Sequence, residues 1–310
     1  MIESDLDISI AALALQRSSM LKVAPLRDML LRLRYSVIRD VDVEKVIEFA
    51  GFDMQSVTTD VGEATRDIER GLELGINPIP ISSERYPAIL RGILDAPPII
   101  YIRGSISAFK ALPGVAVVGT RKASAHGLAI ASRISEFLSN EGRSVVSGLA
   151  LGIDAAAHEG ALLGATPTIA VLAHGLENAQ PVTNRYLAQR ILENGGLWVS
   201  EHAVGVPAKP ANFVLRNRIQ VGLSCASIIV EGEAQSGSKT QAEYCLRSKR
   251  ALFAVLPEPG SRVATVSELP RMLVNVRGAT PIYSKRDYPA MMAMIERSSA
   301  MLEGSAYRSQ

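Results

Sequence analysis

Between residues 115 and 257 the chain alternates short runs of Val, Ile and Leu with longer segments that suit helices. The apolar runs lie at 115–119, 143–147, 167–173, 196–200, 226–231 and 251–256. Runs of this length that are apolar throughout are typical of parallel strands covered by helices on both faces. The alternation therefore predicts an α/β fold with a mostly parallel sheet flanked by helices.

Four of the predicted strand-to-helix junctions carry residues that suit contact with an anion. They lie at 117–121, 146–150, 213–218 and 235–240, and are rich in Gly, Ser, Arg and Asn. Right-handed crossovers leave the carboxyl ends of parallel strands at one edge of a sheet. Junctions that are more than a hundred residues apart can therefore meet in one crevice. The sequence predicts a single anion site there.

The junctions offer different groups to the anion. Gly119 lets the backbone approach a phosphate at a helix N-terminus, and Arg121 supplies a planar fork of donors. Arg216 and Arg218 would point about 200° apart on a helix, so they cannot serve one face. We expect one of these arginines to grip the ligand and the other to brace a loop.

The fourth junction is close to a Walker A motif. Ser238, however, is an extra residue between Gly237 and Lys239, which displaces the lysine from the phosphates. No strand ending in aspartate supplies magnesium chemistry either. We therefore favour an anion nest at a helix N-terminus, and a hydrolytic NTPase is a minority hypothesis.

Asp154 and His158, four residues apart, would share one face of a helix and could act as an acid and a base. No serine or cysteine nucleophile is placed with them as a catalytic triad requires. We favour a structural role, with Asp154 as a helix cap or loop anchor. No catalytic residue, metal site or cofactor is predicted.

The flanking segments differ in character from the core. Leu26, Met29, Leu30 and Leu33 follow one helical apolar stripe. We expect a small helical domain at 1–75, a proline-rich linker with an edge strand at 76–112, the core at 113–284, and a short helix with a frayed tail at 285–310.

The composition is ordinary for a globular protein. With 47% hydrophobic residues, 21% charged residues and a net charge of +2, the chain suits neither disorder nor a strongly basic DNA coat. Cys225 and Cys245 lack metal-binding spacing, so reduced structural thiols are expected. The acidic N-terminus and the lack of a long apolar run predict a cytoplasmic protein without a membrane segment.

The motifs and their order resemble the DprA/Smf family of DNA-processing proteins. The resemblance covers residues 80–260 and is carried by the segments 119–121, 147–158, 168–172, 200–201, 216–224 and 236–238. It implies an extended Rossmann-like fold with a helical N-terminal domain. It also implies a homodimer that binds single-stranded DNA and helps to load the RecA recombinase in natural transformation or recombination.

The resemblance assigns a phosphate-binding pocket to nine residues: Gly119, Thr120, Arg121, Ser147, Arg216, Asn217, Ser236, Gly237 and Ser238. The predicted DNA-binding set also includes their neighbours Gly148, Arg218, Lys239 and Thr240.

The chain departs from the family pattern at Lys239, which adds a charge at a helix start, and at Gln180, where the family has Tyr. Fewer than thirty residues of the sequence follow the predicted core, so we expect no winged helix among them. Two alternatives to DNA processing stay open. One is a nucleotide-binding or phosphoribohydrolase-like protein with Glu201 or Glu243 as its carboxylate. The other is a DprA-like component of a phage-defence or toxin–antitoxin module.

Overall fold

The computed structural model describes residues 3–36, 40–258, 260–261 and 265–308. Within this part of the chain the strands are β1 Ile76–Pro80, β2 Ile99–Gly104, β3 Gly114–Val118, β4 Val145–Ser147, β5 Ile169–Val171, β6 Leu197–Ser200, β7 Ser224–Ile229, β8 Ala251–Val255 and β9 Thr280–Ile282. They form one sheet in the order β1-β2-β6-β5-β4-β3-β7-β8-β9. Neighbours from β6 to β9 are parallel, whereas β2 is antiparallel to β1 and β6. The expected fold, a mostly parallel, Rossmann-like sheet flanked by helices, is confirmed.

Helices precede, connect and follow the strands. The α-helices are α1 Glu3–Arg17, α2 Val23–Arg34, α3 Val43–Phe49, α4 Thr58–Glu73, α5 Ala88–Arg91, α6 Ala125–Asn140, α7 Ile153–Ala161, α8 Arg185–Glu193, α9 Pro210–Leu215, α10 Asn217–Gly222, α11 Gly237–Arg247, α12 Glu268–Arg277 and α13 Tyr288–Arg308. Short 3-10 turns are η1 Met54–Val57, η2 Ile106–Ala111, η3 Val182–Asn184 and η4 Lys285–Asp287.

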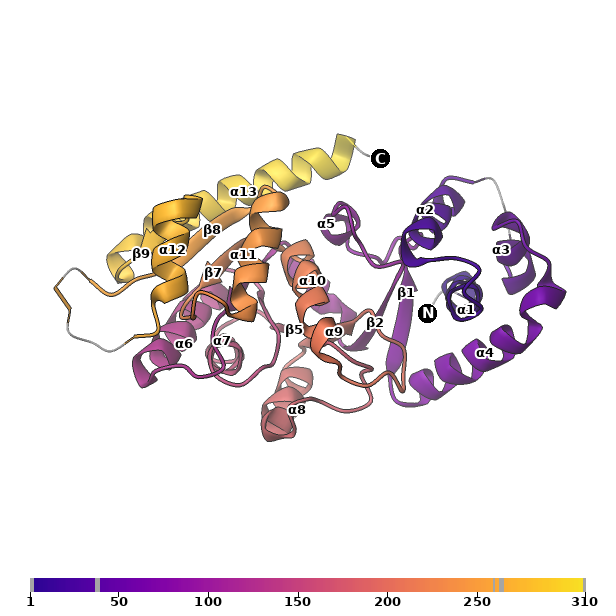
Figure 1. Ribbon diagram of the computed structural model, residues 1–310, viewed down its shortest axis with the longest axis horizontal. Helices are drawn as coiled ribbons and strands as arrows, with labels where there is room; N and C mark the ends of the chain where they lie inside the picture. Colours follow the sequence, from indigo (N-terminus) through magenta and orange to yellow (C-terminus); the bar gives the residue numbers. More distant parts are fainter. Residues whose placement is uncertain (1–2, 37–39, 259, 262–264, 309–310) are drawn as a thin grey trace.

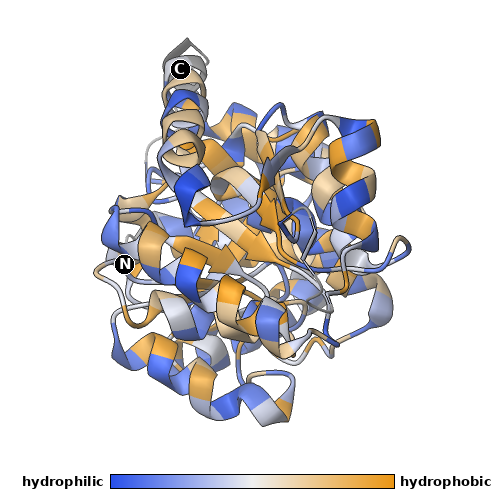
Figure 2. Cartoon of the chain, turned by 90° about the vertical axis from the view of Figure 1, so that its left-hand side faces the viewer, coloured by the Kyte–Doolittle hydropathy of each residue, from blue (hydrophilic) through white to orange (hydrophobic). Residues whose placement is uncertain are grey.

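Both faces of the sheet are covered. Phe253 and Val255 of β8 pack in one hydrophobic cluster with α6, α7 and α13, whereas Leu252 and Ala254 pack in another with α11 and α12. This alternation follows from the two-residue period of a strand. Figure 1 shows the helices on the two sides of the sheet, and Figure 2 shows strands that are hydrophobic along their length. Burial on both faces explains the unbroken apolar runs in the sequence.

The four N-terminal helices pack at the β1 end of the sheet (Figure 1). The predicted stripe on α2 is confirmed, since Leu26, Met29, Leu30 and Leu33 are all buried. These side chains belong to the same hydrophobic cluster as Ile100 and other residues of β1 and β2. The helical region thus shares its core with one end of the sheet.

The two strands that the sequence did not predict, β1 and β9, are the edges of the sheet. Both contain proline: Pro78 and Pro80 in β1, and Pro281 in β9. Proline lacks an amide hydrogen and is tolerated on edge strands, where one side of the ladder needs no donor. The interpretation of residues 76–80 as linker is therefore wrong. The expected edge strand, β2, lies instead between β1 and β6.

The C-terminal helix is longer than expected. α13 has 21 residues, where the sequence predicted a short helix and a frayed tail. Tertiary contacts hold its second half, because Ser298 Oγ donates to the carbonyl oxygen of Cys225 at 2.6 Å and Arg143 donates to Ser299 Oγ at 3.2 Å.

Cys225 and Cys245 are free, buried thiols. Among the described helices, none is both long enough and apolar enough to cross a membrane.

Candidate functional site

The strand order reverses at β3. From β3 the chain passes through α6 to β4, β5 and β6 on one side, and β7, β8 and β9 lie on the other. Helix α6 covers one face of the sheet and α11, which follows β7, covers the opposite face. In open α/β sheets such a switch point leaves a crevice at the carboxyl ends of the strands, and ligands bind there.

A pocket of about 520 Å³ occupies this crevice. We call it the crevice pocket. Its lining residues are Val118, Gly119, Thr120, Arg121, Lys122, Ala150, Asp154, Pro210, Phe213, Val214, Arg216, Asn217, Gln220, Glu233, Ser236, Gly237, Ser238 and Gln241. All four predicted junctions contribute at least one residue, although they span more than a hundred positions. Eight of the predicted site residues are among them: Gly119, Thr120, Arg121, Arg216, Asn217, Ser236, Gly237 and Ser238.

The other five predicted site residues lie outside this lining. Ser147 is buried and its hydroxyl donates to the carbonyl oxygen of Val117 at 2.7 Å. Gly148 lies directly behind the Arg216 guanidinium. Lys239 and Thr240 belong to the first turn of α11 but do not face the pocket. The fifth, Arg218, is held by carboxylates.

The loop after β3 is fixed by Glu231. The Glu231 carboxylate accepts hydrogen bonds from the amide of Ser124 at 2.8 Å and from its hydroxyl at 2.7 Å, and the Glu231 carbonyl accepts from Thr120 N at 2.8 Å. Gly119 is required for close packing: a Cβ there would lie 2.6 Å from Ile153 Cγ1 and 2.7 Å from the Glu231 carbonyl oxygen. The loop is thus held in one shape before any ligand arrives.

Arg121 projects from this loop over an aromatic ring. Its guanidinium carbon lies 5.2 Å from the centroid of the Phe213 ring, which α9 supplies. Stacking of this kind orients a guanidinium and leaves its in-plane donors free. Arg121 itself is exposed, so these donors are available at the mouth of the pocket.

The loop after β4 is strained and anchored. Leu149 has φ of +59°, an uncommon left-handed conformation for a leucine, and Gly152 has φ of +78°. Strain of this kind clusters at functional sites. The Asp154 carboxylate accepts from Gly148 N at 3.1 Å, so Asp154 is a loop anchor as expected. Burial raises the pKa of Asp154, and the Arg216 charge opposes that rise.

Arg216 forms the floor of the pocket. One terminal nitrogen donates to the carbonyl oxygens of Gly148 at 2.8 Å and Val171 at 2.5 Å. A Cβ at Gly148 would overlap this guanidinium, so only glycine leaves room for it. Burial lowers the pKa of Arg216, although Asp154 counteracts part of that effect. Arg216 therefore presents a desolvated cation beneath the crevice.

Arg218 has the opposite environment. It forms a two-pronged ion pair with Glu201, with N–O distances of 2.7 and 2.5 Å, and donates to the carbonyl oxygen of Asp95 at 2.9 Å. Burial alone would lower the pKa of Arg218, but pairing with Glu201 outweighs burial and raises it. Arg218 is the arginine that braces a loop.

Four buried polar atoms of the pocket lining have no hydrogen-bond partner in the described protein: Arg216 Nε, Gln220 Nε2, Ser236 Oγ and Gln241 Oε1. An unsatisfied buried group costs about 1–3 kcal/mol, so such groups call for an explanation. A polar ligand in the pocket would satisfy them. The side chain of Asn217, by contrast, is used within the protein, since it donates to the carbonyl oxygen of Gly237 at 3.1 Å.

Sequence reasoning missed several lining residues. Gln220 and Gln241 lie four residues after Arg216 and Gly237, which puts them one helical turn further along the same face. That spacing was a usable signal. Lys122, Pro210 and Glu233 had none, because they reach the pocket through loop shape and the position of α9.

The remaining candidate acids and bases do not meet in the pocket. In the described structure Glu201 is paired with Arg218, and the exposed Glu243 is outside the lining. His158 is fully buried, with Nδ1 2.8 Å from Thr168 Oγ1, and burial lowers its pKa to about 3. The imidazole is therefore neutral and structural, as the sequence analysis favoured.

Comparison with known proteins matches this geometry to one family. The family model of DNA recombination-mediator protein A matches residues 77–296. The chain is 35% identical over 215 residues to DNA processing protein DprA of Bacillus subtilis, covering 69% of this chain and 71% of that one. It is 40% identical over 181 residues to protein Smf of Escherichia coli, covering 58% of this chain and 48% of that one.

A solved structure agrees with the sequence matches. The X-ray structure of DprA from Streptococcus pneumoniae superposes with a TM-score of 0.73 at 28% identity, covering 89% of this chain and 95% of that one. DprA of Helicobacter pylori has the same fold, with a TM-score of 0.60 at 24% identity, covering 70% of this chain and 95% of that one. The expected resemblance is confirmed: the chain belongs to the DNA recombination-mediator protein A family, the DprA/Smf proteins.

Proposed function

We propose that the protein binds single-stranded DNA through the crevice pocket, which holds backbone phosphates, and that it acts in DNA recombination or transformation without catalysing a reaction. The observation that carries the proposal is the convergence of Arg121, Arg216 and the N-terminus of α11 on one pocket with unsatisfied polar groups. Helix N-termini and guanidinium groups both favour phosphate oxygens. The DprA of H. pylori, which shares the fold, has a single-stranded DNA binding mode of its own.

Phosphate contact should outweigh base stacking. Only 5% of the residues are aromatic, and the lining contains one aromatic ring, Phe213, which Arg121 covers in the described structure. Binding of that kind depends strongly on salt, because each phosphate contact releases a counterion. The slope of log affinity against log salt should be about −0.7 for each phosphate contacted.

Fluorescence anisotropy of a labelled oligothymidine at several salt concentrations tests the proposal. We expect salt-dependent binding that Arg121→Ala weakens about tenfold, equivalent to ~1.4 kcal/mol, with a shallower slope. Lys110→Ala is the matched control, because Lys110 is exposed and lies outside the pocket. Unchanged affinity in Arg121→Ala would remove the site assignment.

A hydrolytic role has less support. The two carboxylates that the phosphoribohydrolase alternative needs, Glu201 and Glu243, are not in the described pocket lining. Incubation with nucleoside monophosphates and detection of free base would test that alternative. Base release that Glu243→Gln abolishes would favour it over the binding proposal.

We further propose that the protein acts in the cytoplasm as a homodimer and presents DNA to a RecA-type recombinase. The support for this proposal is that the chain belongs to the DprA/Smf family, for which a homodimer and a recombinase partner are expected. Sedimentation of the protein and co-precipitation with a RecA-type recombinase, with and without oligonucleotide, test the two parts. Capture of a toxin or phage protein in place of the recombinase would favour the defence-module alternative.

A further inference from the structure

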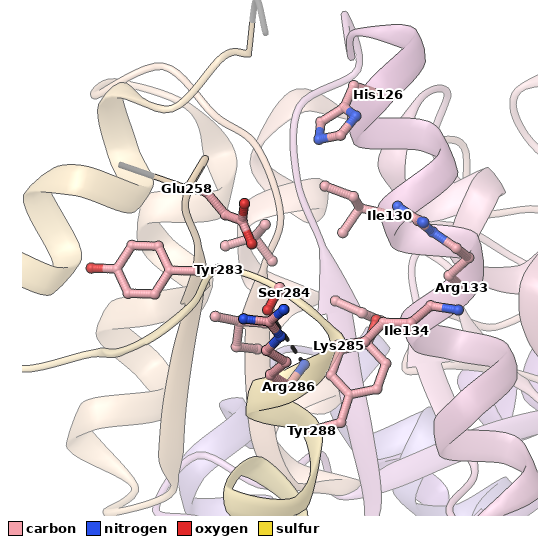
Figure 3. Close-up of a pocket in the computed structure, with 12 residues that line it drawn as sticks. His126, Ile130, Arg133, Ile134, Glu258, Tyr283, Ser284, Lys285, Arg286 and Tyr288 are labelled. Carbon is pink, nitrogen blue, oxygen red and sulfur yellow. Dashed lines mark hydrogen bonds between the residues drawn. The ribbon is translucent and has the colours of Figure 1, made fainter. Parts of the chain in front are cut away.

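A second pocket, of about 340 Å³, opens between α6 and the start of α13. We call it the α6–α13 pocket (Figure 3). Three of its side chains are cationic: Arg133 of α6, and Lys285 and Arg286 of η4. His126 and one carboxylate, Glu258, also line it. Its walls include the carboxyl ends of β8 and β9, so it opens at the same edge of the sheet as the crevice pocket.

The three cations are available to a ligand. Each is exposed, and none forms an ion pair with a carboxylate in the described part of the chain. Arg133 uses only its Nε, which donates to the carbonyl oxygen of Ala129 at 3.2 Å. An excess of cations over carboxylates favours an anion in this pocket.

Near the start of α13 the backbone can attract an anion through the helix dipole, but its nearby amides are not free to donate to one. The amides of Tyr283 and Ser284 donate to the Asp287 carboxylate at 2.8 and 2.9 Å, so they are already satisfied. The pocket still lies at the N-terminal end of a 21-residue helix, whose dipole favours negative charge. Binding here therefore depends on the side chains of Arg133, Lys285 and Arg286.

One loop joins the two pockets. Thr120, Arg121 and Lys122 line the crevice pocket, and His126, four residues after Lys122, lines the α6–α13 pocket. Four residues span at most about 14 Å between Cα atoms. A stacked single strand rises ~3.4 Å per nucleotide, so about four nucleotides cover that distance, and about three more cover the two turns of α6 from His126 to Arg133.

We infer that the α6–α13 pocket is a second phosphate-binding site, which takes the backbone of the same DNA strand about four to seven nucleotides from the crevice pocket. The inference rests on the proposed function. Either a DNA strand that continues from the crevice pocket or a free nucleotide could supply a phosphate to this pocket. The short spacing between the two pockets favours the DNA strand.

Oligothymidines of two lengths test the inference, one of about 4 nucleotides that fills the crevice pocket and one of about 12 that reaches both pockets. The variant is Arg133→Gln/Lys285→Gln/Arg286→Gln. The matched control, Lys110→Gln/Arg277→Gln/Arg297→Gln, removes the same charge from exposed positions outside both pockets. We expect the variant to bind the short oligonucleotide like wild type and to lose affinity for the long one. Its salt slope on the long oligonucleotide should be shallower by ~2, about 0.7 per lost contact.

Failure of wild type to bind the short oligonucleotide would contradict the proposed function itself. Normal short-strand binding, with an unchanged long-strand slope in the variant, would overturn the second site alone. Two further readouts are decisive if that slope is unchanged. Loss of thymidine monophosphate binding in the variant would assign the pocket to a free nucleotide. An altered sedimentation coefficient would assign it to an interface between copies of the chain. Either result overturns the inference.

Discussion

Arg216 and Arg218 are two residues apart and both buried, but they differ in how fully the protein supplies their hydrogen-bond partners. Arg218 is matched on every side that the structure describes, by Glu201 and by the carbonyl oxygens of Asp95 and Leu215. Arg216 is buried to a similar degree but has an unpartnered Nε, and it opens onto a pocket in which three further buried polar atoms, on Gln220, Ser236 and Gln241, lack a partner in the described protein. A buried charged group whose hydrogen bonds are all made within the protein indicates a structural role. Buried polar atoms that lack a partner within the protein indicate a ligand site.

The largest expected effect is on the Arg218 side. Replacing Arg218 with Met leaves the Glu201 carboxylate, 15% exposed, without its partner. Breaking a buried ion pair in this way costs about 3–5 kcal/mol of unfolding free energy. Urea denaturation measures the loss. Arg218→Met/Glu201→Leu should recover part of it, and a loss below ~1 kcal/mol in the single variant would show that Arg218 is not a brace.

On the Arg216 side, Gly148→Ala should affect both stability and binding. The added methyl group overlaps the Arg216 guanidinium, and overpacking of this kind costs about 1–3 kcal/mol. Displacement of Arg216 should also weaken oligonucleotide binding in the anisotropy assay. Gly237→Ala is the control for stability, since a Cβ there meets nothing within 4 Å. Wild-type behaviour of Gly148→Ala would mean that the Arg216 position is not tightly constrained.

The pH dependence of stability can show whether His158, which lies near Arg216, is as fully buried from solvent as the structure indicates. Its pKa is lowered to about 3 by burial, and the Arg216 charge adds to the shift. The unfolded state, with an ordinary pKa of ~6.5, binds more protons between these values. Stability should therefore fall as the pH drops below ~6.5, by about 2 kcal/mol at pH ~5.

Urea denaturation of wild type and His158→Gln, once above pH ~6.5 and once at pH ~5, measures this dependence. The difference between the two proteins isolates the histidine. A wild-type protein whose extra loss at low pH is no greater than that of His158→Gln would contradict a neutral, desolvated His158.

The smallest effect is expected at Lys239. It extends from the first turn of α11 but lies outside the pocket lining, whereas Arg121 is in it. Lys239→Ala should therefore change oligonucleotide affinity less than about twofold, because the half-buried Lys239 lies away from the proposed contact. A loss as large as that of Arg121→Ala would place Lys239 on the DNA and extend the site along α11.

Much of the fold was predictable because strands buried on both faces leave an unambiguous pattern. Each apolar run between residues 115 and 257 became a strand, and both ends of each strand lie within two residues of the expected positions. The edge strands β1 and β9 were not predictable, since proline is read as a strand breaker unless the edge position is known. The second half of α13 was missed because Ser298 and Ser299 are polar, and their hydrogen bonds to other elements, which help to hold the helix there, leave no local pattern in the sequence.

The site was predictable at its junctions and not between them. Gly119, Arg121 and Gly237 could be grouped because parallel strands bring their carboxyl ends together. The expected strand-to-helix junction at 213–218 was wrong in kind, since Arg216 lies between helices α9 and α10 and reaches the crevice from there. Which of Arg216 and Arg218 faces the ligand depends on where Glu201 lies, and the sequence does not give that position. The pocket between α6 and α13 depends on the packing of two helices that are far apart in the chain, so no local motif indicated it.

A crystal structure of the protein with a short oligothymidine bound would show whether DNA occupies the crevice pocket. We expect a backbone phosphate in the crevice pocket, in contact with Arg121 and with amides at the start of α11, and accepting a hydrogen bond from a donor that lacks a partner, such as Gln220 Nε2. DNA bound elsewhere on the protein, with this pocket empty, would contradict it.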